Sequence, residues 1–198
     1  MVKPAGNIAT QPVPDSANYE QPLSERMRTF LRLEFLYHPM LRNSGRDDDW
    51  ATRATISTLI EILAILSRGD VRSEILSELD HQLGALEPFQ SHARVDGGRL
   101  GNLMHILSTS RDEISSIGTG YLQSLKGSDF LNSIKHRSAI PGGTCEFDLP
   151  EYSHWLRQPI QRRQQDMAQW IQSVQPLCDG VSKVLWLIRE SAQPKQKY

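Results

Sequence analysis

The stretch Ile140-Pro-Gly-Gly-Thr-Cys-Glu-Phe-Asp-Leu-Pro150 decides which fold class the sequence predicts. Pro141 fixes its own φ, and one of the two glycines after it supplies a positive φ, so a type II turn is expected. Residues 144–149 then alternate between polar and apolar side chains, which is typical of a short strand. Pro150 cannot donate to a ladder, so the strand is expected to end there.

The remainder of the chain has the apolar spacing and end signals of helices. Ser24 and Asp70 are expected to cap helix starts, because their side-chain oxygens can accept a hydrogen bond from the first turn. Pro39 is expected to end the first helix, and Gly69 to close the second. The predicted helices span residues 24–37, 50–68, 71–86, 99–117, 130–136, 160–174 and 176–191.

These elements predict a mainly α protein, a helical bundle domain with a small and here incomplete β-strand domain. The predicted organisation is a disordered lead at 1–18, a helical domain at 19–139 with 19–23 as a candidate strand, a turn and strand at 140–158, C-terminal helices of the helical domain at 159–192, and a frayed tail at 193–198.

Composition excludes several classes of protein. The 198 residues carry 22 basic and 23 acidic side chains, so the net charge of −1 creates no general attraction to nucleic acid. Cys145 and Cys178 form no disulfide framework. The polar, Pro-rich N-terminus does not resemble a signal peptide, and the longest apolar run, Ile56–Leu66, is too short to cross a bilayer. We therefore expect a cytoplasmic protein without membrane insertion.

Four blocks of the sequence, in this order, resemble ZapD, the Z-ring-associated protein D family of bacterial cell division. They are Tyr19–Leu36, Arg68–Asp80, Ile140–Pro150 with Trp155-Leu156, and Trp170–Ala192. The resemblance implies a cytoplasmic, non-enzymatic homodimer that is recruited to the division site at mid-cell. It further implies binding to the acidic C-terminal tail of the tubulin-like protein FtsZ and bundling of FtsZ protofilaments.

The sequence departs from the ZapD pattern in a few places. Family members continue well beyond the position of Ala192 with further strands, which is why the β part is expected to be incomplete here. This chain also adds a polar lead before Tyr19. Many members have a histidine two residues before the tryptophan, where this sequence has Ser153, with His154 beside it.

The first predicted helix offers one candidate partner-binding site. Arg28 and Arg32 are four residues apart and lie between Phe35 and Leu36 on a helical projection, so both guanidinium groups emerge from largely apolar surroundings. Such arginines suit the carboxylates of an acidic tail. The alternative is that they pair within the protein, with Glu25 or with an acid on a neighbouring helix.

Glu34 falls within what we expect to be the apolar face of this helix, together with Met27, Phe30, Leu31 and Phe35. A carboxylate in such a place needs compensation. We expect an ion pair with an arginine, and a catalytic acid is the less favoured reading.

Basic residues also flank the turn and strand. Lys135, His136 and Arg137 precede the turn, and Arg157, Arg162 and Arg163 follow the strand. With His154 beside Trp155, these residues predict an anion-binding groove where the helical and β parts meet, and the residues chosen for it are Lys135, Arg137, His154 and Arg157. The alternative is a solvated surface.

No motif predicts an enzyme, a cofactor or a small-molecule substrate. The sequence lacks a nucleophile elbow, a phosphate-binding loop and paired metal-ligand cysteines or histidines. Asp47–Asp49 could ligate a cation, but acids are also favoured before a helix. The four tryptophans are expected at scattered core positions. The competing function is a generic helical dimerisation or nucleic-acid-binding module without FtsZ activity.

Overall fold

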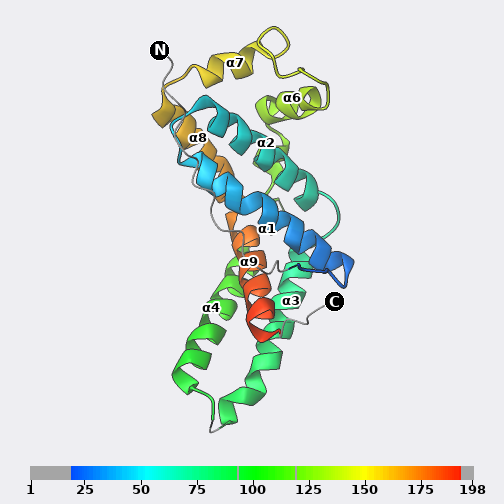
Figure 1. The fold of residues 1–198 in the computed structure, drawn as a ribbon, viewed down its shortest axis with the longest axis vertical. Helices are drawn as coiled ribbons and strands as arrows, with labels where there is room; N and C mark the ends of the chain where they lie inside the picture. Colours follow the sequence, from blue (N-terminus) through cyan, green and yellow to red (C-terminus); the bar gives the residue numbers. More distant parts are fainter. Residues whose placement is uncertain (1–18, 93, 119, 193–198) are drawn as a thin grey trace, which may run out of the picture.

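The computed structural model describes residues 19–92, 94–118 and 120–192, and this part of the chain is helical without a strand (Figure 1). The helices are α1 (Glu25–Ser44), α2 (Asp49–Leu66), α3 (Val71–Leu86), the 3₁₀ helix η1 (Glu87–Ser91), α4 (Gly97–Ser116), α5 (Gln123–Lys126), α6 (Asp129–Ser138), α7 (Pro150–Leu156), α8 (Ile160–Gln172) and α9 (Gln175–Ser191). The prediction of a mainly α protein is confirmed.

Side-chain caps explain where the first helices begin. The Ser24 hydroxyl accepts a hydrogen bond from the Met27 amide at 3.2 Å, and Asp70 accepts one from the Ser73 amide at 3.1 Å. Both caps confirm the sequence prediction. Asp48 caps α2 in the same way, through the Ala51 amide at 2.7 Å. Each cap satisfies an amide that the helix itself cannot pair.

The molecule is elongated, and α9 joins its two halves. Helices α1 and α2 form an antiparallel pair in one half, with α6 and α7 at the far end (Figure 1). The hairpin of α3 and α4 makes the other half. Helix α9 packs against α1, α3 and α4, so one helix contributes to the core of both halves.

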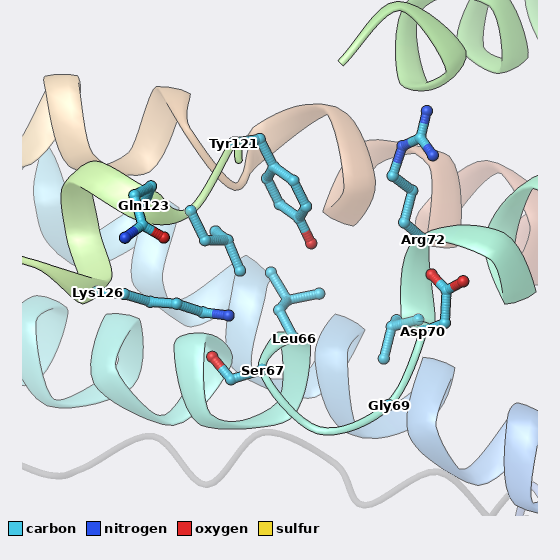
Figure 2. A pocket seen from close by; sticks show the side chains of 10 residues that line it. Leu66, Ser67, Gly69, Asp70, Arg72, Tyr121, Gln123 and Lys126 are labelled. Atoms are coloured by element: carbon cyan, nitrogen blue, oxygen red, sulfur yellow. The ribbon is translucent and has the colours of Figure 1, made fainter. Parts of the chain in front are cut away.

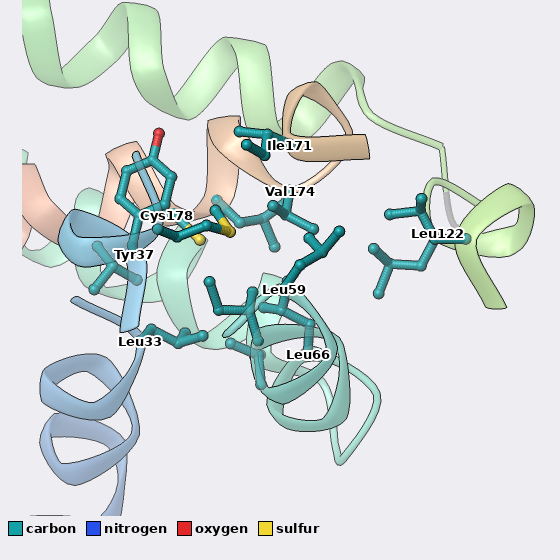
Figure 3. Packing of buried hydrophobic residues seen from close by; sticks show 14 of the residues in the cluster. Leu33, Tyr37, Leu59, Leu66, Leu122, Ile171, Val174 and Cys178 are labelled. Atoms are coloured by element: carbon teal, nitrogen blue, oxygen red, sulfur yellow. The ribbon is translucent and has the colours of Figure 1, made fainter. Parts of the chain in front are cut away.

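The core between α1, α2 and α9 is largely apolar and includes the buried Tyr37, whose hydroxyl has a partner. Leu33 and Tyr37 of α1 meet Leu59 of α2 and Cys178 of α9 (Figure 3). The Tyr37 hydroxyl donates a hydrogen bond of 2.7 Å to Asp179, and burial followed by this bond raises the pKa of Tyr37. Each fully buried leucine of this core stabilises the fold by roughly 1.5–3 kcal/mol.

Gly180 allows α9 to approach α4 closely. A Cβ atom at this position would lie 2.7 Å from Cδ1 of Ile114 on α4 and 3.3 Å from Cγ2 of Ile75 on α3. Because a methyl group does not fit at these distances, glycine sets how near the two halves of the molecule come to each other.

The prediction that Pro39 ends the first helix is wrong, because α1 continues to Ser44. Proline removes the hydrogen bond to the carbonyl of the residue four positions earlier, which is Phe35. Phe35 lies on the outer side of α1 and is 76% exposed. Water can therefore reach this side of the helix, and the interruption is tolerated.

The strand predicted at residues 144–149 is also wrong, although the turn before it is confirmed. Gly142 has φ of 73°, and the Gly143 amide donates to the Ile140 carbonyl at 2.9 Å, as a type II turn requires. Further turns follow, in which the Leu149 amide donates to the Cys145 carbonyl at 3.0 Å. These amides are satisfied locally and need no neighbouring strand.

The side chains of this segment do not alternate between two faces either. Leu149 is buried and Cys145 partly buried, whereas Phe147 is 84% exposed. Pro150 does not follow a strand but is the first residue of α7. Proline lacks an amide hydrogen, and at the first position of a helix that hydrogen would have no partner within the helix. Residues 19–23, the other candidate strand, precede α1 without forming a strand.

The expectation that the tryptophans are scattered through the core is wrong. Trp155 and Trp170 lie with ring centroids 5.7 Å apart and gather around Phe130, at 5.5 and 5.7 Å from its ring. Trp155 donates its indole hydrogen to Asp166 at 2.9 Å. Trp50 and Trp186 lie at the surface instead. The cluster fastens α6, α7 and α8 together.

Candidate partner-binding site

The outer surface of α1 combines exposed apolar and basic side chains. The buried side of this helix carries Phe30, Leu33, Tyr37 and Met40. The opposite side carries the partly buried Leu31 and Pro39, the strongly exposed Phe35, and three arginines. These arginines are Arg28, Arg32 and Arg42.

An open hollow of about 590 Å³ follows this outer side of α1. It is larger than a hollow of about 230 Å³ that lies elsewhere on the molecule. We call the larger hollow the α1 groove. Leu31, Phe35 and Pro39 supply its apolar surface. Its charged lining consists of Glu20, Glu34, His38, Arg42 and Arg189. An apolar floor with charges at its edge suits an extended or helical peptide better than a small substrate.

Arg189 of α9 holds the two acids of the groove. Its Nη1 and Nη2 donate to Glu34 at 2.9 and 2.6 Å, and Nη2 donates to Glu20 at 2.9 Å. A further bond joins its Nε to Glu20. Hydrogen bonding to Arg189 lowers the pKa of Glu20, and both acids raise the pKa of Arg189. One guanidinium therefore binds both acids but offsets the charge of only one of them.

The expected ion pair of Glu34 with an arginine is therefore confirmed, and its partner comes from α9. Glu34 is 13% exposed, which agrees with a carboxylate that needs compensation. His38, one turn along α1, has its Nε2 3.7 Å from Glu34. Glu20, the other acid bound by Arg189, keeps 47% of its side chain exposed at the surface of the groove.

Arg28 and Arg32 differ in their surroundings. The Nε of Arg28 donates to Glu25 at 3.1 Å, which is the internal pairing that the sequence left open. The side chains of Arg28 and Glu25 are 43% and 85% exposed, so this ion pair contributes little to stability. Arg32 is exposed and makes no ion pair with another residue that the structure describes. Its guanidinium is available to a partner.

The basic residues around α6 and α7 are mostly paired with acids of the same region. Arg137 lies 3.6 Å from Asp148, and Arg157 pairs with Glu146. His154 shares a hydrogen bond of 2.9 Å with Gln158. Lys135 lines a small hollow against α2 instead. Arg137 and Arg157 thus both pair with acids of the 144–149 segment, and Lys135 is the residue of the four that lines this small hollow.

Arg162 and Arg163 have separate roles. Arg162 lies 3.5 Å from Asp166 of its own helix. Arg163 is buried and donates to Asp49 at 2.7 Å and to Thr52 at 3.1 Å, so it fixes α8 to α2. In Figure 1, α6 and α7 lie at one end of the molecule, apart from the start of α1. Arg28 and Arg32 thus belong to a different surface from Lys135, Arg137, His154 and Arg157.

Phe35, Arg42 and Arg189 belong to the α1 groove and were not recognised as site residues from the sequence. Phe35 was assigned to the same face as Phe30, but residues five apart differ by roughly 140° around a helix. Phe35 and Arg42 are seven residues apart, which places them on the same side of a helix. This spacing was the feature of the sequence that could have identified both as residues of one surface. No sequence signal pairs Arg189 with α1.

Within residues 19–92, 94–118 and 120–192, no group of three or more His, Cys, Asp or Glu side chains could hold a metal ion. None of the helices in these ranges has the length and apolar character that crossing a bilayer requires.

Comparison with known proteins places the chain in a family. A family model described as "ZapD: Cell division protein" matches residues 31–198. The cell division protein ZapD of Methylococcus capsulatus is 36% identical over 174 residues, which cover 88% of this chain and 68% of that protein. The chain belongs to the ZapD family of cell division proteins.

Other ZapD proteins are similar to the same extent. The ZapD of Ralstonia nicotianae is 37% identical over 88% of this chain and 69% of its own length, and that of an Azoarcus species is 33% identical over 91% and 72%. The family match begins at Leu31, so it includes Phe35 and Arg42 of the α1 groove and also Arg32 on the outer side of α1. A role in cell division follows from the ZapD family.

Proposed function

We propose that this ZapD-family chain is a non-enzymatic cell division adaptor that binds the acidic C-terminal tail of FtsZ and bundles FtsZ protofilaments. Membership of the ZapD family is the observation that carries the proposal. In this role the protein works in the cytoplasm and is recruited to the division site at mid-cell. Its partners are FtsZ and a second copy of itself.

The α1 groove is the tail-binding site that we favour. Phe35 offers an exposed aromatic surface to an apolar side chain of the tail, and Arg32 offers an uncommitted guanidinium to a carboxylate. Arg28 and Arg42 add positive charge on the same side of α1. Arg189 offsets one of the two charges of Glu20 and Glu34, and Arg42 adds a second positive charge to the lining, so the repulsion of an acidic peptide is reduced.

Bundling requires that one particle hold two filaments. A homodimer with one groove in each protomer provides this, and simultaneous binding multiplies a weak single-site affinity by raising the effective concentration of the second tail. Lys135, Arg137, His154 and Arg157 remain proposed as further contacts of the tail. Of these, Arg137 and Arg157 pair with described acids and His154 bonds to Gln158, whereas Lys135 has no ion pair with a described residue.

The competing function is a helical dimerisation or nucleic-acid-binding module. The balanced charge of the chain argues against nucleic acid, because affinity for a phosphate backbone rests mainly on basic excess. Sedimentation with FtsZ filaments, beside a gel-shift assay with DNA at the same salt concentration, separates the two. We expect the protein to sediment with filaments, and less so as salt rises. A gel shift without sedimentation would overturn the proposal.

A further inference from the structure

The α1 groove contains a side chain of the type that gains or loses a proton near neutral pH. This side chain is His38, and histidine changes its charge between about pH 5 and pH 8. The other charged residues of the lining are Glu20, Glu34, Arg42 and Arg189. Carboxylates and guanidinium groups ordinarily keep their charges over this range of pH.

The imidazole of His38 belongs to the network of charges in the groove. Its Nε2 lies 3.7 Å from Oε1 of Glu34, one turn earlier on α1. Glu34 accepts hydrogen bonds from Arg189 of α9, which also binds Glu20. The side chain of His38 is 55% exposed, whereas that of Glu34 is 13% exposed. Solvent and a bound peptide can therefore both reach the imidazole.

The balance of charge in the α1 groove depends on the proton of His38. With His38 neutral, Glu20 and Glu34 bring two negative charges, and Arg42 and Arg189 bring two positive charges. Protonation of His38 adds a third positive charge and no acid. The lining then carries a surplus of one positive charge, which favours an acidic ligand.

The other titratable groups beside His38 do not remove this surplus. The rings of Tyr37 and His38 have centroids 6.1 Å apart, but burial raises the pKa of Tyr37, so its hydroxyl stays neutral. Asp179 of α9 accepts the hydrogen bond of that hydroxyl at 2.7 Å. Because Arg189 already binds Glu34, the charge of a protonated His38 stays available to a partner.

We propose that His38 makes tail binding in the α1 groove depend on pH, and that its protonated form binds the acidic peptide more tightly. This inference rests on the proposed function, because it concerns the same groove. The carboxylates of the tail stay ionised between about pH 6 and pH 8, so the change arises in the groove. By reciprocity, binding of the peptide favours the uptake of a proton by His38.

The hollow of about 230 Å³ at the α2–α3 turn provides a comparison. Its charged lining residues are Asp70, Arg72 and Lys126, and the described lining contains no histidine. Figure 2 shows Lys126 and the Tyr121 hydroxyl directed toward the space above Leu66. Burial raises the pKa of Tyr121, which moves its titration further from neutral pH. A peptide bound in this hollow would therefore not gain affinity as the pH falls from about 8 to 6.

Calorimetric titration of the full chain with a synthetic peptide of the FtsZ C-terminal tail, at about pH 6 and about pH 8 and at one ionic strength, tests the inference. We expect the wild type to bind roughly two- to fivefold more tightly at the lower pH, as an exposed ion pair allows. His38→Gln should bind at both pH values as weakly as the wild type does at the higher one. His38→Lys, which keeps a positive charge, should bind tightly at both.

His105→Gln is the matched control, because His105 is an exposed histidine of α4 that does not line the α1 groove. It should keep the pH dependence of the wild type. Melting temperatures at both pH values show whether each variant is folded. Titrations in buffers that differ in ionisation enthalpy measure proton uptake without any substitution. We expect uptake on binding by the wild type and none by His38→Gln.

Equal affinity of the wild type at the two pH values, or the same change in His38→Gln, would overturn the inference and leave the proposed function standing. Sedimentation with filaments without binding of the peptide at either pH would overturn it as well. A wild type that binds no peptide and does not sediment with filaments would overturn both the inference and the proposed function.

Discussion

Arg189 of α9 reaches Glu34 of α1 through two hydrogen bonds, at 2.9 and 2.6 Å, and so ties together helices that are far apart in the sequence. Glu34 lines the α1 groove, and Arg189 forms an ion pair with it. The pair therefore serves the fold and also sets the charge of the groove.

Replacing Arg189 with methionine should destabilise the protein. The substitution keeps most of the side-chain volume but leaves Glu34 without its guanidinium, and we expect a loss of about 1–2 kcal/mol in the free energy of unfolding, because partial exposure screens the pair. Urea unfolding measures this. Arg157→Met is the matched control, since the exposed pair with Glu146 should change stability by less than about 0.5 kcal/mol.

Reversing the charges of Arg28 and Arg32 together should abolish sedimentation with FtsZ filaments while the melting temperature stays near that of the wild type. Close interfacial charge pairs are worth roughly 1.5 kcal/mol or more, which is enough to remove a weak interaction. The fold should tolerate the change, because Arg28 pairs with the exposed Glu25. A variant that keeps its melting temperature and still bundles filaments would show that α1 is not the site.

Phe35→Ala should weaken tail binding without affecting the fold. Phe35 is 76% exposed, so its removal should change stability by no more than about 0.5 kcal/mol. An aromatic anchor in an interface commonly contributes about 2 kcal/mol, so peptide affinity should fall by more than tenfold. Titration with the tail peptide measures the change. Phe147→Ala, which removes an equally exposed ring near α7, is the control and should bind normally.

Gly143→Ala should destabilise the turn before α7. A Cβ atom at this position would overlap the Arg137 carbonyl and lie 2.9 Å from Cβ of Ile140. We expect a loss of roughly 1–3 kcal/mol in thermal or urea unfolding. Gly101→Ala within α4 meets nothing within 4 Å and should instead raise stability, by up to about 1 kcal/mol. Equal effects of the two substitutions would contradict this reading of the turn.

The contribution of Glu20 to stability should disappear in acid. The hydrogen bond from Arg189 lowers its pKa below 4.5, so the folded protein favours the charged carboxylate. Stability from this group is present above pH 4.5 and is lost as the pH falls through the lower, folded-state pKa. Wild type and Glu20→Gln should therefore differ in unfolding free energy at neutral pH and converge as the pH falls below the folded-state pKa of Glu20. A constant difference across this range would exclude the ionised pair as its cause.

Local signals in the sequence predicted the helices well. The caps at Ser24 and Asp70 and the turn at Gly142 depend on neighbouring residues alone, and the structure confirms each of them. The strand at residues 144–149 failed because six alternating residues satisfy a strand pattern and a series of turns equally well. Pro150 is compatible with either, since it can follow a strand or open a helix.

The candidate site was predictable only in part. Arg28 and Arg32 lie on the outer side of α1, but Phe35 was placed on the wrong face and Arg189 was missed. Contacts between α1 and α9 join segments more than a hundred residues apart. The spacing of residues within either segment does not indicate which distant residue it will contact. A count of basic residues likewise could not predict that Arg137, Arg157 and His154 pair with local partners.

The position of α9 has a consequence for how the chain matures on the ribosome. Helices α1, α3 and α4 are synthesised long before α9, yet each of them packs its apolar side against it. Until Leu177, Val181 and Val184 have emerged, those earlier helices expose the surfaces that these residues later cover. During this interval the nascent chain avoids aggregation by binding chaperones or by completing synthesis and folding quickly.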